Sequence, residues 1–330
     1  MPSVSNSVNK DFPILIIGAG SIGERHIRNL WNLGYHNLFV FRIRNLPFRD
    51  IAGAQVQVIT DWEYINDMRP FAAFICTPTA QHMQQTIDCL QLDMHVFVEK
   101  PLSHNLERFD ELKELVKEKN KYLQVGYMMR FHPLILQIKD HISNKTYGNL
   151  ISFHTHWGSY LPNWHPWEDY KNSYAAKKEL GGGVALTLSH DLDLANWIVN
   201  TDIISHHSIF NRSSQLDIDV ESVTDFLIQY NNNITGHVHL NYLEHEPRRQ
   251  YEFIFEEAVM QMNYFKNELQ IISPKGNKNI LLQDFDRNDL FSNEVKYFFA
   301  QVSEKEDHTE QSLRQINESE IIIKMCNAKY

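Results

Sequence analysis

The chain has 330 residues, of which 43% are hydrophobic and 22% are charged, and its formal net charge is −10. This length and composition are typical of a globular protein with room for two domains. The negative charge disfavours nucleic acid or an anionic membrane surface as the main partner. Three cysteines without paired spacing favour a reducing cytoplasm over disulfides or structural zinc, and no apolar run approaches the ~20 residues of a membrane span. We therefore expect a cytoplasmic protein without a metal, nucleic-acid or membrane partner.

The N-terminal part contains a glycine pattern that is typical of nucleotide binding. A continuous apolar run at 14–17 is followed by Gly18, Gly20 and Gly23, and a helical pattern begins within the glycines. The first glycine permits a tight turn, the second lets a pyrophosphate approach, and the third lets the helix pack closely on the strand. The free N–H groups of the helix would then face the anion. Alone this spacing is a weak signal, but here it follows a predicted strand and opens a predicted helix.

The second predicted strand, residues 38–41, ends at Arg42, with Arg44 two places later. In an NAD-type fold an acidic residue about 20 places beyond the glycines binds the ribose 2′-hydroxyl. Arg42 lies 19 residues after Gly23. A guanidinium there would bind a 2′-phosphate that a carboxylate would repel. The alternatives are a preference for NADP(H) over NAD(H), which we favour, and two solvated arginines in a loop.

Strands and helices alternate over the first 125 residues, which predicts a doubly wound parallel sheet with right-handed crossovers. Polar residues follow the strand ends, where ligands bind in such folds: Thr77 to His82 after one strand, and Glu99-Lys100-Pro101 after another. Further strands are expected at 56–60, 71–76, 94–98 and 122–125, and helices at 24–33, 61–69 and 105–119.

Beyond Gly126 the pattern changes to consecutive, often alternating strands, which favours an antiparallel sheet with one covered face. We expect an α/β domain at 1–125 and an α+β domain at 126–330. Its strands are expected at 151–157, 222–230, 234–243, 251–256, 258–264 and 268–273, and its helices near 186–200, 289–304 and 311–328.

Two segments contain candidate catalytic groups. Lys100 follows a strand in the expected crevice, where a lysine can hold or release a proton; the alternative is an exposed lysine before a turn. The second segment runs from Leu180 through three glycines into a largely apolar helix. His190 and Asp193 lie three residues apart there, with Thr187 a turn earlier. An acid that orients the imidazole would favour a base, although a satisfied core histidine is the commoner arrangement.

Aromatic and polar residues interleave from Tyr160 to Tyr170, and Tyr174 follows. Flat rings and hydrogen-bonding groups together are what a sugar site needs, although an oligomer contact would use the same residues. His154 and His156 share a strand face without a third metal ligand, so we expect a structural pair. The candidate substrate contacts are Lys100, Tyr160, Trp164, His165, Tyr174, Thr187 and His190.

The motifs GAGSIGERH, CTPTAQH, VFVEKP, VGYMMRFHP and GGGVALTLSHDLD occur in this order over nearly the whole chain. In these the chain resembles the Gfo/Idh/MocA family of NAD(P)-dependent oxidoreductases. The resemblance implies a Rossmann domain, then an α+β domain whose large open antiparallel sheet mediates a homodimer or homotetramer. It also implies Lys100 and His190 as catalytic residues and Glu99 as a ribose contact. The implied cofactor contacts are Gly18, Gly20, Ser21, Ile22, Gly23, Arg42, Arg44, Thr77, Pro78, His82, Glu99, Lys100 and Arg130.

The chain departs from the family at one catalytic position. Many members have an aspartate one turn before the histidine, where this chain has Leu186 and Thr187. Asp191 or Asp193 would have to compensate, so we include Asp193 among the catalytic candidates. The segment from Asn163 to Gly183 resembles bacterial enzymes of surface-glycan and unusual-sugar metabolism. We expect a sugar or sugar-nucleotide dehydrogenase or reductase. The alternatives are an NAD-dependent glycosidase of the same family and a non-catalytic NAD(P)-binding regulatory protein.

Overall fold

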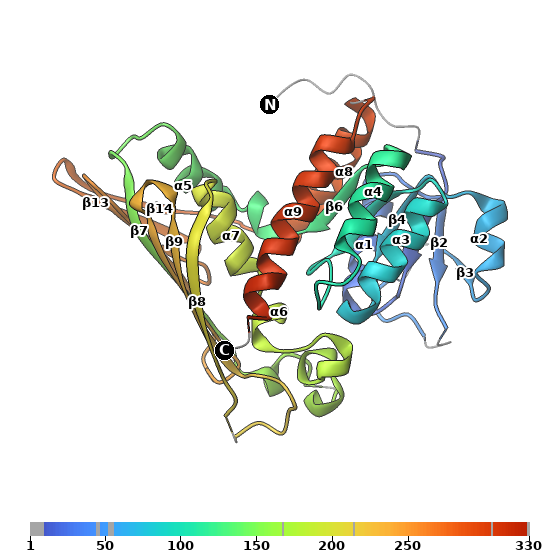
Figure 1. The fold of residues 1–330 in the computed structure, drawn as a ribbon, viewed down its shortest axis with the longest axis horizontal. Helices are drawn as coiled ribbons and strands as arrows, with labels where there is room; N and C mark the ends of the chain where they lie inside the picture. Colours follow the sequence, from blue (N-terminus) through green and yellow to red (C-terminus); the bar gives the residue numbers. More distant parts are fainter. Residues whose placement is uncertain are drawn as a thin grey trace. The chain divides into compact units, whose positions relative to one another are not determined.

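The computed structural model describes residues 10–43, 47–51, 56–166, 168–213, 215–304 and 306–328 (Figure 1). The chain forms two compact units, which we describe separately. The first contains the residues up to Tyr127 together with Asn288–Ile321, and the second contains Met128–Arg287 and Ile322–Tyr330. The first division lies two residues from the predicted boundary at 125/126. Residues 288–321, however, belong to the first unit and not to the predicted second domain.

The first unit is built on a sheet of six parallel strands in the order β3-β2-β1-β4-β5-β6. The order and the parallel pairing confirm the predicted doubly wound α/β fold. The strands are β1 Ile14–Ile17, β2 Leu38–Phe41, β3 Gln57–Ile59, β4 Ala72–Ile75, β5 His95–Glu99 and β6 Leu123–Gly126. The helices are α1 Ser21–Asn32, α2 Glu63–Met68, α3 His82–Gln91, α4 Phe109–Lys119, α8 Asn288–Glu304 and α9 Thr309–Cys326, whose last turn belongs to the second unit.

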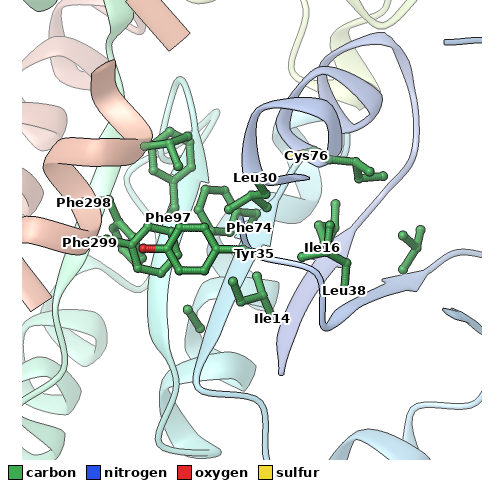
Figure 2. Packing of buried hydrophobic residues seen from close by; sticks show 14 of the residues in the cluster. Ile14, Ile16, Leu30, Tyr35, Leu38, Phe74, Cys76, Phe97, Phe298 and Phe299 are labelled. Carbon is green, nitrogen blue, oxygen red and sulfur yellow. The ribbon is translucent and has the colours of Figure 1, made fainter. Parts of the chain in front are cut away.

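Aromatic rings explain why α8 belongs to the first unit. Phe298 and Phe299 pack into the same buried cluster as Phe74 and Phe97 of the central strands (Figure 2). Phe299 stacks on Tyr35 at a centroid distance of 4.1 Å. The burial of such large apolar side chains contributes about 1.5–3 kcal/mol each. One face of the parallel sheet is therefore covered by a helix that follows the whole second sheet in sequence.

The second unit is built on an eight-stranded sheet in the order β14-β13-β12-β11-β7-β10-β9-β8. Its pairs are antiparallel except β7 with β10, which run parallel, so the sheet is mixed where the sequence predicted antiparallel pairing throughout. Two strands, β8 and β14, were not predicted. The strands are β7 Leu150–Gly158, β8 Ile203–Asn211, β9 Val223–Tyr230, β10 Thr235–Asn241, β11 Arg248–Phe255, β12 Val259–Asn263, β13 Glu268–Ser273 and β14 Gly276–Leu281.

Burial alternates along the strands of this sheet, so one face is covered and the other is open. The short helix α6 Val184–Thr187 packs against β9 and β10, and α7 His190–Val199 packs against β7 and β10. These two replace the single helix predicted at 186–200. The remaining helix, α5 Pro133–Ser143, was not predicted.

The open face presents His154 and His156 beside His237 and His239 of the neighbouring strand, with centroid distances of 4.7 Å in each pair. Asp225 accepts hydrogen bonds from the last two of these imidazoles. The predicted histidine pair is thus part of a larger polar surface. Among the described residues, no helix combines the length and apolar character needed to cross a bilayer.

Candidate functional site

The turn between β1 and α1 shows what each of its three glycines does. Gly18 has φ +91°, and a Cβ there would lie 3.0 Å from the Cys76 carbonyl oxygen. A Cβ at Gly23 would lie 2.2 Å from the Gly18 oxygen, but a Cβ at Gly20 would meet nothing within 4 Å. Gly20 is also the N-cap of α1 and provides no side-chain cap. The turn therefore leaves open space at an uncapped helix N-terminus, which fits the pyrophosphate of a dinucleotide. Ser21 and Ile22 begin this helix.

The other predicted cofactor residues of the first unit follow the carboxyl ends of neighbouring strands. Arg42 follows β2, Thr77 follows β4, and Lys100 follows β5. Because these strands run parallel to β1, their ends meet at the edge that holds the glycine turn. The hydroxyl of Thr77 donates to Gln85 Oε1 at 2.6 Å. One edge of one unit thus contains most of the predicted cofactor contacts.

Arg42 occupies the position after β2 that an acidic residue takes in an NAD-type fold. Its side chain is half-buried and its guanidinium lies 4.1 Å from the centroid of Phe48. This stacking orients a planar cation at the end of the strand. Arg44, the second residue predicted to bind a 2′-phosphate, lies outside the described residues.

Glu99 and Lys100 are fixed by contacts within the first unit. Glu99 ends β5, and its Oε1 lies 2.7 Å from Nε2 of His26 on α1. The backbone N–H of Lys100 donates to Oε2 of Glu99 at 3.3 Å. The Lys100–Pro101 peptide bond is cis, one of the two isomers that the sequence allowed. Glu99 is thus oriented from two sides directly before the candidate catalytic lysine.

His82 is buried between two loops at this edge. Its Nδ1 lies 2.7 Å from the Pro101 carbonyl oxygen and its Nε2 lies 2.7 Å from that of Thr77. Burial lowers the pKa of His82, although both carbonyl contacts oppose this shift. With both ring nitrogens engaged, the imidazole links the loops after β4 and β5. The geometry therefore favours a positioning role for His82 over the direct cofactor contact that its motif implied.

In the second unit, His190 begins α7, next to the break that separates this helix from α6. Its ring centroid lies 6.3 Å from that of Trp157 on β7. Thr187 ends α6 and neighbours Tyr242, whose pKa is raised by burial. The break places the candidate histidine in the first turn of a helix, three residues after Thr187.

Both aspartates that follow His190 are held by arginines. Arg130 donates through Nε to Oδ2 of Asp193 at 2.9 Å and through Nη2 to Oδ1. Arg249 donates through Nη2 to Oδ2 of Asp191 at 2.6 Å, and its guanidinium lies 3.9 Å from the ring of Trp157. Both aspartate side chains and Arg249 are almost fully buried. These pairings favour structural roles for Asp193 and Arg130, in place of the catalytic and cofactor roles predicted for them.

The predicted substrate segment lies in the second unit, and the rings of Tyr160, Trp164 and Tyr174 are half-buried. Tyr160 contacts His245 at a centroid distance of 3.9 Å. Trp164 donates through Nε1 to Ser159 and meets Tyr242 edge-to-face at 5.4 Å. His165 follows Trp164, and Tyr174 begins a 3₁₀ helix. Trp164 and Thr187 thus share Tyr242 as a neighbour, which brings two of the substrate candidates near one another.

Sequence reasoning missed Glu221. Its Oε1 accepts from the N–H of Ala185 at 3.1 Å, and a Cβ at Gly183 would lie 2.3 Å from the same oxygen. The third glycine therefore leaves room for a carboxylate that caps α6. Sequence reasoning also missed Glu294, a buried acid on α8 that lies near Glu99 and His26. His26 belongs to the GAGSIGERH motif. No local pattern marks a distant acid, because its partner is found only by folding.

Comparison with known proteins matches both units to models of the same family. Residues 12–127 match the family model described as "Oxidoreductase family, NAD-binding Rossmann fold". Residues 135–261 match the "GFO/IDH/MocA C-terminal domain". The two matches cover the parallel sheet and most of the mixed sheet.

Similar proteins include "Uncharacterized oxidoreductase YrbE" of Bacillus subtilis, 31% identical over 57% of this chain and 54% of the relative. "Myo-inositol 2-dehydrogenase" of Thermotoga maritima is 28% identical over 57% of this chain and 55% of the relative. The chain thus spans about half the length of these two relatives. It is 26% identical to "scyllo-inositol 2-dehydrogenase (NAD(+))" of Bacillus subtilis over 86% of this chain and 84% of the relative.

Solved structures with the same fold include "Levoglucosan dehydrogenase, complex with NADH". Its TM-score is 0.79 at 17% identity, with 96% of each chain covered.

Proposed function

Because this chain belongs to the Gfo/Idh/MocA family of oxidoreductases, we propose that it transfers a hydride between a nicotinamide cofactor and a sugar. The reacting group is a carbinol or ketone carbon of a free sugar or a sugar nucleotide. The main support is the edge of the first unit, where the open glycine turn and Lys100 follow neighbouring parallel strands. The relatives named as inositol dehydrogenases act on ring carbinols, which supports the same reaction class here.

Lys100 and His190 are the proposed proton-handling pair. Oxidation of a carbinol removes a hydroxyl proton as the hydride leaves, and the nicotinamide cofactor supplies the hydride acceptor when bound. Lys100 would hold or accept that proton at Nζ, and His190 would serve as the second acid–base group. The two residues belong to different units, so the proposal rests on their motifs and on the local environment of each.

NADP(H) is the proposed preferred cofactor, because Arg42 stands where an acidic ribose ligand would exclude a 2′-phosphate. Arg42→Asp should weaken NADP(H) binding by about tenfold or more, the effect of one charge-assisted contact. Binding of NAD(H) should weaken less or improve. Calorimetric titration of both cofactors measures the preference, and tighter NAD(H) binding by the natural chain would contradict it.

The substrate is proposed to be a sugar destined for a bacterial surface glycan or an unusual-sugar product. The aromatic segment from Tyr160 to Tyr174 supports this, since it leads into the glycines before His190. The charges favour an uncharged sugar over a nucleotide diphosphate, because Arg130 and Arg249 are engaged with aspartates. Lys177 and Lys178, which follow Tyr174 in the sequence, remain the candidate positive charges that could bind a diphosphate.

A screen of free sugars, polyols and sugar nucleotides tests the function, with thermal shift for binding and nicotinamide absorbance for turnover. A substrate should give a net absorbance change, and Lys100→Met and His190→Ala should each lower kcat by about 10²–10⁴-fold. Arg108→Gln, an exposed position on the first unit, is a control that should retain activity. Turnover without a net absorbance change would instead indicate a glycosidase that returns its hydride. Near-normal activity in both variants would refute the assigned roles.

The proposed assembly is a homodimer or homotetramer that forms through the open face of the eight-stranded sheet. That face combines the histidine pairs with the exposed side chains of Leu227, Ile254 and Ile272. Such a mixed polar and apolar surface is typical of subunit interfaces. The three free cysteines, all buried, are consistent with the proposed cytoplasmic location.

A further inference from the structure

Beneath the cofactor edge of the first unit, three titratable side chains from distant parts of the sequence come together. His26 is on α1, Glu99 ends β5, and Glu294 is on α8. One ring nitrogen of His26 and one carboxyl oxygen of each glutamate all lie within 4.8 Å of one another. His26 and Glu294 have no exposed surface, and Glu99 is 8% exposed. Glu294 is anchored because Gln124 donates a side-chain hydrogen bond to its backbone carbonyl at 3.2 Å.

This cluster has more hydrogen-bond acceptors than donors. A carboxylate only accepts, so the 2.7 Å contact with Glu99 requires the proton of a neutral His26 to be on Nε2. Nδ1 of that imidazole is then an acceptor, and it is buried without a hydrogen-bond partner. Both carboxyl oxygens of Glu294 are likewise buried without a partner. A buried polar group in this state costs about 1–3 kcal/mol, so an additional donor in the cluster would be strongly favoured.

The charges around Glu294 lead to the same conclusion. Burial raises the pKa of Glu294 well above its ordinary value, the nearby Glu99 raises it further, and Arg25 opposes both effects. Arg25 is on α1 and lies 4.5 Å from the ring of Phe291; burial raises the pKa of the Cys76 thiol, and both acids raise it further. Two ionised carboxylates at this separation in a dry site repel one another strongly. One proton removes the repulsion and also supplies the missing donor.

We propose that Glu294 is a positioning residue that holds a proton on its own carboxyl group beside the carboxylate of Glu99. This arrangement fixes the carboxylate of Glu99, which the family resemblance implies as a contact of the cofactor ribose, so the functional part of the inference rests on the proposed binding of a nicotinamide cofactor. A divalent cation is the other way to neutralise two carboxylates. The 2.7 Å contact of His26 with Glu99 is a hydrogen-bond distance and favours the proton.

Glu294→Gln tests the proposed proton, because an uncharged amide of the same shape also supplies a donor. A carboxyl whose pKa is raised on folding stabilises the protein at low pH. That stability is lost as pH rises from the ordinary carboxyl range through the raised value. The denaturation midpoint of the natural protein should therefore fall between pH 5 and 9 more steeply than that of Glu294→Gln. Asp289→Asn, which removes an exposed carboxylate from the same helix, should leave the slope unchanged. Equal slopes in the natural protein and Glu294→Gln would overturn the proposal.

Two further readouts separate the proton from a metal and from the proposed function. Infrared difference spectra at pH 8 should show a protonated-carboxyl band in the natural protein that is absent from Glu294→Gln. A stoichiometric divalent ion that is lost in this variant would overturn the proposal. NADPH binding should change by less than about threefold in Glu294→Gln and weaken by about tenfold in Glu294→Leu, which offers Glu99 no polar partner. If neither NADPH nor NADH binds the natural protein, the proposed function fails, while the pH dependence still tests the proton.

Discussion

The second unit buries Asp191 and Asp193 against guanidinium groups, whereas the first unit buries Glu99 and Glu294 beside the imidazole of His26. An arginine keeps its charge at every pH that a protein survives, so each of these aspartates faces a cation that does not titrate. The glutamates have no such partner in contact and must share a proton or repel one another. The comparison shows that the role of a buried acid near a candidate catalytic residue depends on the group that the acid contacts. The second unit therefore pairs the acids that follow His190 with fixed charges, and the first places a titratable acid beside Glu99.

The largest expected effect in this comparison comes from breaking the fully buried pair of the second unit. Arg249→Met leaves Asp191 as an uncompensated buried charge and should lower the free energy of unfolding by about 3–5 kcal/mol. The double variant Arg249→Met, Asp191→Leu should recover most of that loss, because it removes both charges. Urea denaturation measures both variants. A single variant as stable as the natural protein would show that the pair is unimportant for folding.

A smaller effect is expected for the second pair, because Arg130 is 13% exposed. Asp193→Asn should cost about 2 kcal/mol of stability, and Arg130→Gln added to it should cost little more. Arg108→Gln, which disrupts an exposed pair with Glu111, is the matched control and should not change stability measurably. If Asp193→Asn lowers kcat far more than Arg130→Gln while both remain folded, Asp193 has the catalytic role that the sequence predicted.

At pH values just below about 6.5, the smallest effect comes from two neutral buried histidines, one in each unit. Burial lowers the pKa of His95 to about 3 and that of His132 to about 4. Each accepts a backbone hydrogen bond through Nδ1, from Tyr122 and Leu134 respectively. Below about pH 6.5, the ordinary pKa of histidine, each of these imidazoles therefore binds a proton more readily in the unfolded chain than in the folded protein. Each histidine should lower the free energy of unfolding by about 1.4 kcal/mol per pH unit as pH falls from about 6.5 toward the pKa of that histidine in the folded protein.

His132→Asn should remove this acid sensitivity in the second unit, because asparagine is a good N-cap and cannot be protonated. Thermal denaturation between pH 5 and 7.5 measures the slope. The exposed His36→Asn is the control and should leave the slope unchanged. Glu294 should act in the opposite direction, so the first unit should lose stability on the alkaline side as well as on the acid side. An unchanged acid slope in His132→Asn would refute the role of its burial.

The local pattern of the sequence was sufficient to predict the parallel sheet and its glycine turn. Four apolar residues stopped by glycine can form a buried strand, and the turn after it has few alternatives to glycine. The same reasoning located the loops after β2, β4 and β5, because the ends of parallel strands meet at one edge. It also placed Lys100 and Glu99 at that edge, since these residues directly follow a strand.

Only the tertiary structure decided which partner each polar side chain has and where the last helices belong. Arg130 and Asp193 are 63 residues apart, and Glu99 and Glu294 are 195 apart, so no local period relates them. Helix α8 joins the first unit because Phe298 and Phe299 complete its apolar core, although the strands of the second unit intervene. Local periodicity determines the form of a segment, but burial and charge pairing between distant segments determine its neighbours. The role of each acid depends on those neighbours.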